Sequence, residues 1–254
     1  MSVTDGIAVV TGAGGGLGRA LALELAARGV RVAAIGRSPG GIEETAAMAP
    51  EGRIMTVMAD VADADAVRNA FAAITEAAPV SVLINNAAVY PRRDFLDESG
   101  ESFAATVAVN LGGMVNCTRA ALDGMVRTGR GRIVNVSTFA DMAPLPASAA
   151  YSVSKGAGRI LTRALVADLG DRFPGIVITD WMPGMLATRM GIADGLAPGV
   201  AARWGAALAL WDDPALNGAV FEMNREVLPP RGLKARLRDA LLMRRRPPRV
   251  IPDS

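Results

Sequence analysis

Two side chains suited to proton transfer lie four positions apart in the segment Tyr151-Ser152-Val153-Ser154-Lys155. On a helix this spacing places the Tyr151 phenol and the Lys155 ammonium on one face. A nearby cation favours the phenolate, so it lowers a pKa that is normally about 10 and makes tyrosine usable near neutral pH. An ordinary surface pair is the alternative interpretation. It is disfavoured because the chain has 25 arginines but only two lysines, and because no histidine is present to do acid–base chemistry instead.

A glycine-rich segment near the N-terminus could hold a dinucleotide. Thr11-Gly12-Ala13-Gly14-Gly15-Gly16-Leu17-Gly18 follows the first apolar run and opens the first helical pattern. Glycines there permit a tight turn and let the backbone approach a pyrophosphate, whose charge a helix N-terminus favours. Turns also use glycine for steric reasons alone, so it is the strand–turn–helix context that favours a dinucleotide site.

The elements that must position these groups follow an alternating pattern. Short apolar runs predict strands over residues 7–10, 32–35, 54–57, 82–84, 133–136, 176–178 and 219–221. Amphipathic segments predict helices over residues 18–28, 65–77, 103–127, 151–169 and 200–211. The strands are nearly continuous in apolar character, as expected when both faces of a parallel sheet are covered. The sequence predicts an α/β fold, a doubly wound, mostly parallel, seven-stranded sheet with helices on both faces.

The composition predicts one globular domain. The 254 residues are 51% hydrophobic and 20% charged, which excludes a disordered or collagen-like chain. No stretch approaches the roughly 20 apolar residues of a membrane span. The N-terminus lacks the pattern of a secretory signal, and the single cysteine, Cys117, cannot form an internal disulfide. We therefore expect a cytoplasmic protein.

Positive charge is concentrated at the C-terminal end. Residues 231–254 carry eight basic and two acidic residues, whereas residues 1–230 carry 19 basic and 23 acidic residues. An acidic body gives no indication of nucleic-acid binding. We expect a dinucleotide-binding and catalytic domain over residues 1–230, followed by a basic C-terminal helix or tail over residues 231–254 with Leu233, Leu237 and Leu241 on one side. Docking on the body or on a second subunit is the favoured role; contact with an anionic membrane surface and a disordered tail are the alternatives.

Taken together, the motifs resemble the short-chain dehydrogenase/reductase family over residues 7–223. The glycine-rich segment is similar to the family's cofactor motif, and Tyr151 with Lys155 to its catalytic motif. Four further matches occur in the family's order: Asp60-Val61 near the adenine, Asn85-Asn86-Ala87-Ala88 beside the cofactor, Asn110 on the central helix, and Pro183-Gly184 with Thr188 at the nicotinamide.

This resemblance implies a Rossmann-like fold and a set of roles. Tyr151 would exchange a proton with the substrate oxygen, Lys155 would lower the pKa of Tyr151 and bind the cofactor ribose, and Asn110 would hold a water. The implied cofactor-binding residues are Gly12, Gly14, Gly15, Gly16, Leu17, Gly18, Arg37, Asp60, Val61, Asn86, Ala87, Tyr151, Lys155, Pro183, Gly184 and Thr188. No metal ligand is implied.

A hydroxyl at the end of the fifth strand should orient the substrate oxygen. The family's catalytic serine lies 13 residues before the tyrosine, which here is Thr138, with Ser137 one step earlier. Adjacent strand residues point to opposite faces, so only one of the two can reach the site. The spacing favours Thr138, whose hydroxyl can make the same hydrogen bond.

The sequence departs from the family at three other places. Ala88 replaces a glycine, the strand before Pro183 carries an unusual Asp180-Trp181 pair, and the family's closing Val-Asp-Gly-Gly is absent.

Cofactor preference should be decided at the end of the second strand. An acidic residue there would bind the ribose of NAD, but this chain has Gly36 followed by Arg37. Arg37 could pair with the 2′-phosphate of NADP. We therefore predict NADP rather than NAD, with a solvated arginine as the alternative interpretation.

These observations predict an oxidoreductase that interconverts an alcohol and a ketone or aldehyde on a small substrate. A nucleotide-binding regulator without turnover and a redox-linked isomerase or eliminase are the alternatives. Methionine and tryptophan in the segments that wall the family's pocket indicate an apolar or planar substrate: Met142, Trp181, Met182, Met185 and Met190. Long helices rich in small residues over 103–127 and 151–169 predict a homodimer or homotetramer.

Overall fold

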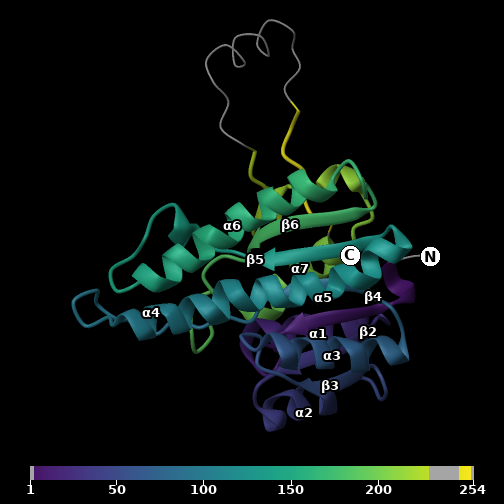
Figure 1. The fold of residues 1–254 in the computed structure, drawn as a ribbon, viewed down its shortest axis with the longest axis horizontal. Helices are drawn as coiled ribbons and strands as arrows, with labels where there is room; N and C mark the ends of the chain where they lie inside the picture. The colour runs from purple at the N-terminus through teal and green to yellow at the C-terminus, as the bar shows by residue number, and fades with distance from the viewer. Residues whose placement is uncertain (1–2, 229–245, 253–254) are drawn as a thin grey trace, which may run out of the picture.

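The computed structural model describes residues 3–228 and 246–252, and it has an eight-stranded sheet at its centre (Figure 1). The strands are β1 (Ile7–Thr11), β2 (Arg31–Gly36), β3 (Ile54–Met58), β4 (Val80–Asn85), β5 (Gly131–Val136), β6 (Ile176–Met182), β7 (Val220–Glu222) and β8 (Arg225–Glu226). Their spatial order is β3-β2-β1-β4-β5-β6-β7-β8. All neighbours are parallel except β7 and β8, which are antiparallel.

Helices cover both faces of the sheet. One face packs against α1 (Gly16–Ala27), α2 (Pro39–Ala47) and α7 (Pro198–Leu210), and the other against α3 (Ala64–Ala77), α5 (Gly113–Thr128) and α6 (Ala149–Leu169). Figure 1 looks onto the second of these faces. Each face has its own apolar core, because alternate residues of the buried strands point to opposite sides. The shorter α4 (Gly100–Val107) packs against α6.

The predicted α/β fold is confirmed, and the structure adds three details. Strand β8 is an eighth strand, too short to leave an apolar run in the sequence. Helix α2 begins with a proline and has only two buried residues, so its periodicity is weak. The helix predicted over residues 103–127 is divided into α4 and α5 by a single turn of π-helix, Ala108–Gly112.

The C-terminal end returns to the body. Val250 bridges to Arg225 of β8, and the Ile251 side chain is buried. The Arg246 guanidinium donates to both carboxylate oxygens of Glu226, at 2.6 and 2.8 Å. Residues 246–252 therefore belong to the folded domain, while the amphipathic segment with Leu233, Leu237 and Leu241 lies outside the described residues.

Candidate active site

The residues of the cofactor and catalytic motifs predicted from the sequence lie at one edge of the sheet, where the parallel strands β1, β4, β5 and β6 have their carboxyl ends. The strand order reverses between β1 and β4, and open α/β sheets bind ligands outside such a switch point. The glycine-rich segment follows β1, and the segment containing Ser137 and Thr138 follows β5. Parallel pairing thus brings together motifs that are more than a hundred residues apart in the sequence.

The glycine-rich loop is shaped by the absence of side chains. Gly12 and Gly16 have φ angles of +67° and +53°, a conformation that favours glycine. A Cβ at Gly18 would collide with the Gly12 carbonyl oxygen. Gly15, in contrast, has extended backbone and open space around its Cα. The loop therefore turns tightly into α1 and leaves its outer side free, as a backbone cradle for a pyrophosphate requires.

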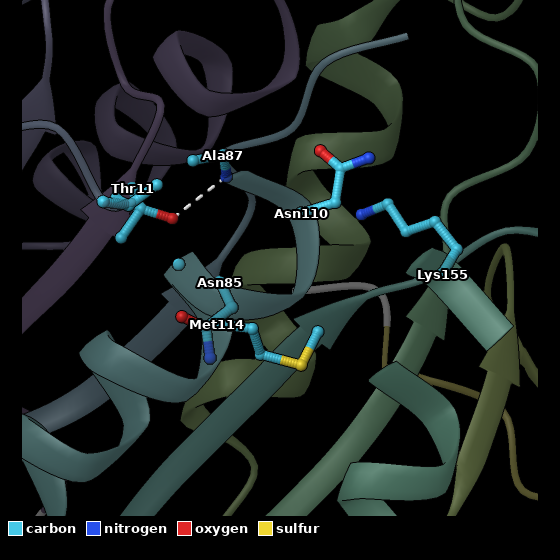
Figure 2. A pocket seen from close by; sticks show the side chains of 8 residues that line it. Thr11, Asn85, Ala87, Asn110, Met114 and Lys155 are labelled. Carbon is cyan, nitrogen blue, oxygen red and sulfur yellow. Dashed lines mark hydrogen bonds between the residues drawn. The ribbon is translucent and has the colours of Figure 1, made fainter. Parts of the chain in front are cut away.

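Hydrogen bonds join this loop to the end of β4. The Thr11 hydroxyl accepts from the backbone N–H groups of Asn86 and Ala87, both at 3.0 Å, and the second bond is drawn in Figure 2. The Asn86 side-chain amide donates to the Thr11 carbonyl at 2.9 Å. The two cofactor motifs that the sequence suggests are thus one rigid unit.

The residues proposed to select the cofactor lie at the edge of this unit. A Cβ at Gly36 would stand 2.7 Å from a methyl of Ile42, so packing of α2 explains the glycine. Arg37 is exposed, and its guanidinium is 3.9 Å from the Asp60 carboxylate. Val61 is buried against Gly113 of α5. Arg37 and Asp60 therefore lie together beside the glycine loop, whereas the Val61 side chain belongs to the core.

Tyr151 and Lys155 lie one turn apart near the start of α6, as predicted. The Lys155 side chain is buried, and its Nζ donates to the Val136 carbonyl at 2.7 Å. Burial lowers the pKa of Lys155 to about 8, against the opposing effect of the Asp180 charge. Lys155 therefore still carries its proton at neutral pH.

Burial also decides the state of Tyr151. Desolvation raises the pKa of the phenol, and Tyr90 raises it further. The hydrogen bond with the neighbouring Thr138 hydroxyl lowers the pKa, but by less. The Tyr90 ring stacks on the Tyr151 ring with centroids 4.5 Å apart and planes 20° apart. The lowering of the Tyr151 pKa that the spacing predicts is not found in this structure, because desolvation of the phenolate outweighs the effect of its polar neighbours.

The two candidate hydroxyls after β5 have different surroundings. Thr138 caps a short 3₁₀ turn by accepting from the Ala140 N–H at 3.2 Å, and it also interacts with Tyr151. Ser137 is buried, and its hydroxyl has no hydrogen-bond partner within the described parts of the chain. The placement of Thr138 agrees with the 13-residue spacing, and its role in the reaction stays a prediction.

Asn110 sits in the π-helical turn and joins three segments. Its Oδ1 accepts from the Val89 N–H at 2.8 Å, and its Nδ2 donates to the Val89 carbonyl and to the Ser154 hydroxyl, both at 3.0 Å. Figure 2 shows Asn110 and Lys155 at a small pocket between the strand ends and α5. The residues that line it are Thr11, Val61, Asn85, Ala87, Asn110, Gly113, Met114 and Lys155.

The loop after β6 closes over the glycine segment. Pro183 is buried, and Gly184 has a φ of +89°. A Cβ at Gly16 would lie 3.5 Å from a methyl of Thr188. The Arg92 guanidinium donates to the carbonyls of Met190 and Gly191, at 3.1 and 2.8 Å, so the loop after β4 is tied to the loop after β6.

Sequence reasoning missed Tyr90 as the partner of Tyr151, and it placed Trp181 and Met182 in the wrong environment. Tyr90 follows the Asn85 motif closely and is the chain's only other tyrosine, which was the available signal. Trp181 and Met182 are almost fully buried, and Trp181 packs against α1 and α7 on the far face of the sheet. They therefore belong to the core and do not line a substrate pocket.

Two further classes of site find no support in the described residues. No cluster of three or more His, Cys, Asp or Glu side chains could hold a metal ion among them. None of their helices has the length and apolar character needed to cross a bilayer.

Comparisons with known proteins agree with the site geometry. Residues 6–196 match the family model described as short chain dehydrogenase. The chain is 36% identical over 186 residues to galactitol 2-dehydrogenase (L-tagatose-forming) from Cereibacter sphaeroides, covering 72% of each protein. It is 37% identical over 195 residues to 2-(R)-hydroxypropyl-CoM dehydrogenase from Xanthobacter autotrophicus, covering 72% of this chain and 76% of that one. A solved short chain dehydrogenase from Bacillus anthracis matches the fold with a TM-score of 0.80 at 23% identity, over 87% of this chain and 96% of that one.

Proposed function

The chain belongs to the short chain dehydrogenase family and is an oxidoreductase of alcohols and carbonyl compounds; from this premise we propose that it uses NADP(H) to reduce a small apolar or planar ketone or aldehyde. The observation that carries the proposal is the partly buried Tyr151, beside Thr138 and one helical turn from Lys155. These groups lie at the same sheet edge as the glycine-rich loop.

The residues present fit a phosphorylated dinucleotide. The loop from Gly12 to Gly18 offers a backbone cradle that side chains would fill. Arg37 is exposed, its guanidinium lies 3.9 Å from the Asp60 carboxylate, and it would pair with a 2′-phosphate. When bound, the cofactor supplies a hydride to the carbonyl carbon of the substrate.

The chain itself supplies the proton. A raised pKa keeps Tyr151 protonated at neutral pH, which is the state that can donate to a carbonyl oxygen as negative charge develops there. Thr138, which lies beside Tyr151, orients that oxygen with a hydrogen bond. Lys155, one helical turn away, would favour the phenolate that remains. The protonated phenol is the form that carbonyl reduction requires.

Exposed apolar side chains around the site support an apolar substrate. Leu96 is 94% exposed, Phe95 67% and Met142 61%. Met185 and Met190 are exposed as well. These residues follow β4, β5 and β6, so they surround the edge where Tyr151 lies.

The proposed function is tested by following NADPH absorbance with two matched panels, alkyl and aryl ketones against ketoses. We expect turnover with the first panel and loss of it in Tyr151→Phe. Turnover restricted to ketoses would contradict the apolar assignment alone. Tight NADPH binding with no redox turnover of any carbonyl or alcohol would favour a regulator, or an isomerase or eliminase if a substrate is rearranged.

We also propose self-association through α5 and α6. Both helices carry exposed apolar residues, Val115 and Val126 on α5 and Val153 and Ile160 on α6. Small residues on these helices permit close packing. Light scattering at micromolar concentration should report a dimer or tetramer, and a monomer would contradict this.

A further inference from the structure

A ladder of buried polar side chains crosses three neighbouring strands beneath α5 and α6. The sheet register pairs Asn85 of β4 with Asn135 of β5, and Asn135 with Asp180 of β6. The Asn85 amide donates to Asn135 Oδ1 at 2.8 Å, and the Asn135 amide donates to the Thr162 hydroxyl at 2.9 Å. That hydroxyl donates to Asp180 Oδ1 at 2.7 Å. All four side chains are at most 5% exposed, so the ladder ends in a buried carboxyl group.

The carboxyl group shares its surroundings with Lys155. Thr162 lies seven residues, or two turns, after Lys155, so both point from the same face of α6 toward the sheet. Lys155 Nζ is bonded to Val136, the residue next to Asn135 on β5. The negative charge of Asp180 acts on Lys155 and favours its protonated form. The two groups form no salt bridge within 4 Å among the ion pairs of the described residues, so their coupling acts through the low-dielectric interior.

A purely structural role does not require a carboxyl group at this position. The Thr162 hydroxyl needs only an acceptor, which an asparagine would provide. Burying a carboxylate carries a desolvation cost that an amide avoids. The presence of an acid at this position therefore points to a role for its charge.

We propose that Asp180 is a positioning residue that maintains the positive charge of Lys155 through the buried interior, with Asn135 and Thr162 fixing the place of its carboxyl group. The inference rests on the proposed function only for the part that Lys155 plays in turnover.

The ionisation of Asp180 is controlled by several neighbours. Burial raises its pKa to about 7, and the Thr162 hydrogen bond acts to lower it. Arg159 and Arg163 of α6 also act to lower it, whereas Asp141, which pairs with Arg159 at 2.9 Å, acts to raise it. On the neighbouring strands, Asp180 pairs with Asn135 of β5 and Val220 of β7, and both residues are uncharged. Asp180 therefore ionises at a lower pH than the one at which Lys155 loses its proton, so there is a pH range in which both groups are charged.

The test uses the scarcity of lysine in this chain. Protein labelled with ¹³C-lysine carries only two lysine side chains, Lys155 and Lys234, so the Lys155 Cε signal can be assigned with Lys234→Arg and followed through a pH titration. We expect the wild-type curve to be broader than that of one group, because Asp180 ionises just below Lys155. Asp180→Asn should give a single-group curve with its midpoint lower by about one pH unit.

Two variants separate charge from structure. Thr162→Val keeps the carboxyl group but removes its hydrogen bond, so the part of the curve due to Asp180 should move to higher pH. Asp123→Asn removes an exposed carboxylate on α5 and should change nothing. If turnover is measurable, the alkaline fall of kcat in Asp180→Asn should begin at lower pH.

A narrow single-group curve in the wild type would overturn the proposal, as would an unchanged Lys155 midpoint in folded Asp180→Asn. If that variant does not fold, the wild-type curve and Thr162→Val still decide. Because the titration needs no substrate, its outcome is independent of whether the proposed reaction is correct.

Discussion

The glycine-rich loop after β1 and the proposed catalytic segment from β5 into α6 lie at the same edge of the sheet but depend on different parts of the chain. The loop acts through backbone and through missing side chains, and its shape is fixed by contacts such as that between Gly18 and Gly12. The catalytic segment acts through side chains buried among other side chains, and the ionisation of Tyr151 and Lys155 depends on residues from other elements. A backbone cradle is therefore nearly self-contained, whereas the chemistry of a buried pair belongs to the whole fold.

The largest expected effect is on the catalytic side. Tyr151→Phe removes the proposed proton donor but keeps the ring that stacks on Tyr90. Turnover should fall by about 10²–10⁴-fold, the usual contribution of a positioned acid. NADPH affinity, measured by fluorescence titration, should change little. A variant that keeps its turnover would show that the proton comes from another group.

The next effect distinguishes the two hydroxyls after β5. Thr138→Val preserves shape and removes the hydroxyl proposed to hydrogen-bond the reacting oxygen, so kcat should fall by about 10²–10³-fold. Ser137→Ala should cost far less, because that hydroxyl has no hydrogen-bond partner in the described structure. Steady-state rates of both variants, compared with Tyr151→Phe, provide the measurement. A severe loss only in Ser137→Ala would reverse the assignment.

On the nucleotide side, Arg37→Asp should reverse cofactor preference. The change replaces the proposed partner of the 2′-phosphate with a like charge next to Asp60, and like-charge repulsion of this kind costs several kcal/mol. Titrating wild type and variant with NADPH and NADH measures the change. Equal affinity of the wild type for both cofactors would contradict the assignment of Arg37.

In the glycine-rich loop, a glycine-to-alanine substitution should destabilise the fold at one position and have little effect at another. A methyl at Gly18 meets the Gly12 carbonyl oxygen, which cannot move aside, so Gly18→Ala should destabilise the fold by about 1–3 kcal/mol. Gly15→Ala is the matched control, with extended backbone and nothing within 4 Å of the new methyl. Thermal unfolding of the two variants measures the difference. Equal melting temperatures would mean that the loop is less constrained than its contacts indicate.

The smallest expected effect concerns the Tyr90 ring, which stacks on the ring of Tyr151. Tyr90→Leu removes a stacked pair worth about 0.5–1.5 kcal/mol, so turnover should fall up to about tenfold. Tyr90→Phe keeps the stacking and should retain most of the activity. Similar losses in both variants would show that the Tyr90 hydroxyl, and not its ring, matters.

The features that could be predicted from the sequence alone are those that depend on patterns within a few residues. Seven strands, the glycine turn into α1 and the shared helix face of Tyr151 and Lys155 follow from periodicity and spacing over a few residues, and the structure contains all of them. The family assignment rests on the same short motifs in their order, and it is confirmed. Strand β8 and helix α2 contain too few buried apolar residues to be predicted from periodicity.

Only the tertiary structure decided the electrostatics of the site. The stacking of Tyr90 on Tyr151 and the coupling of Asp180 to Lys155 join residues that lie far apart in the sequence. The spacing of Tyr151 and Lys155 suggested a lowered tyrosine pKa, but the fold buries the phenol and raises it. A pKa depends on desolvation and on charges within several ångströms, and both are set by the segments that parallel pairing brings to one edge of the sheet.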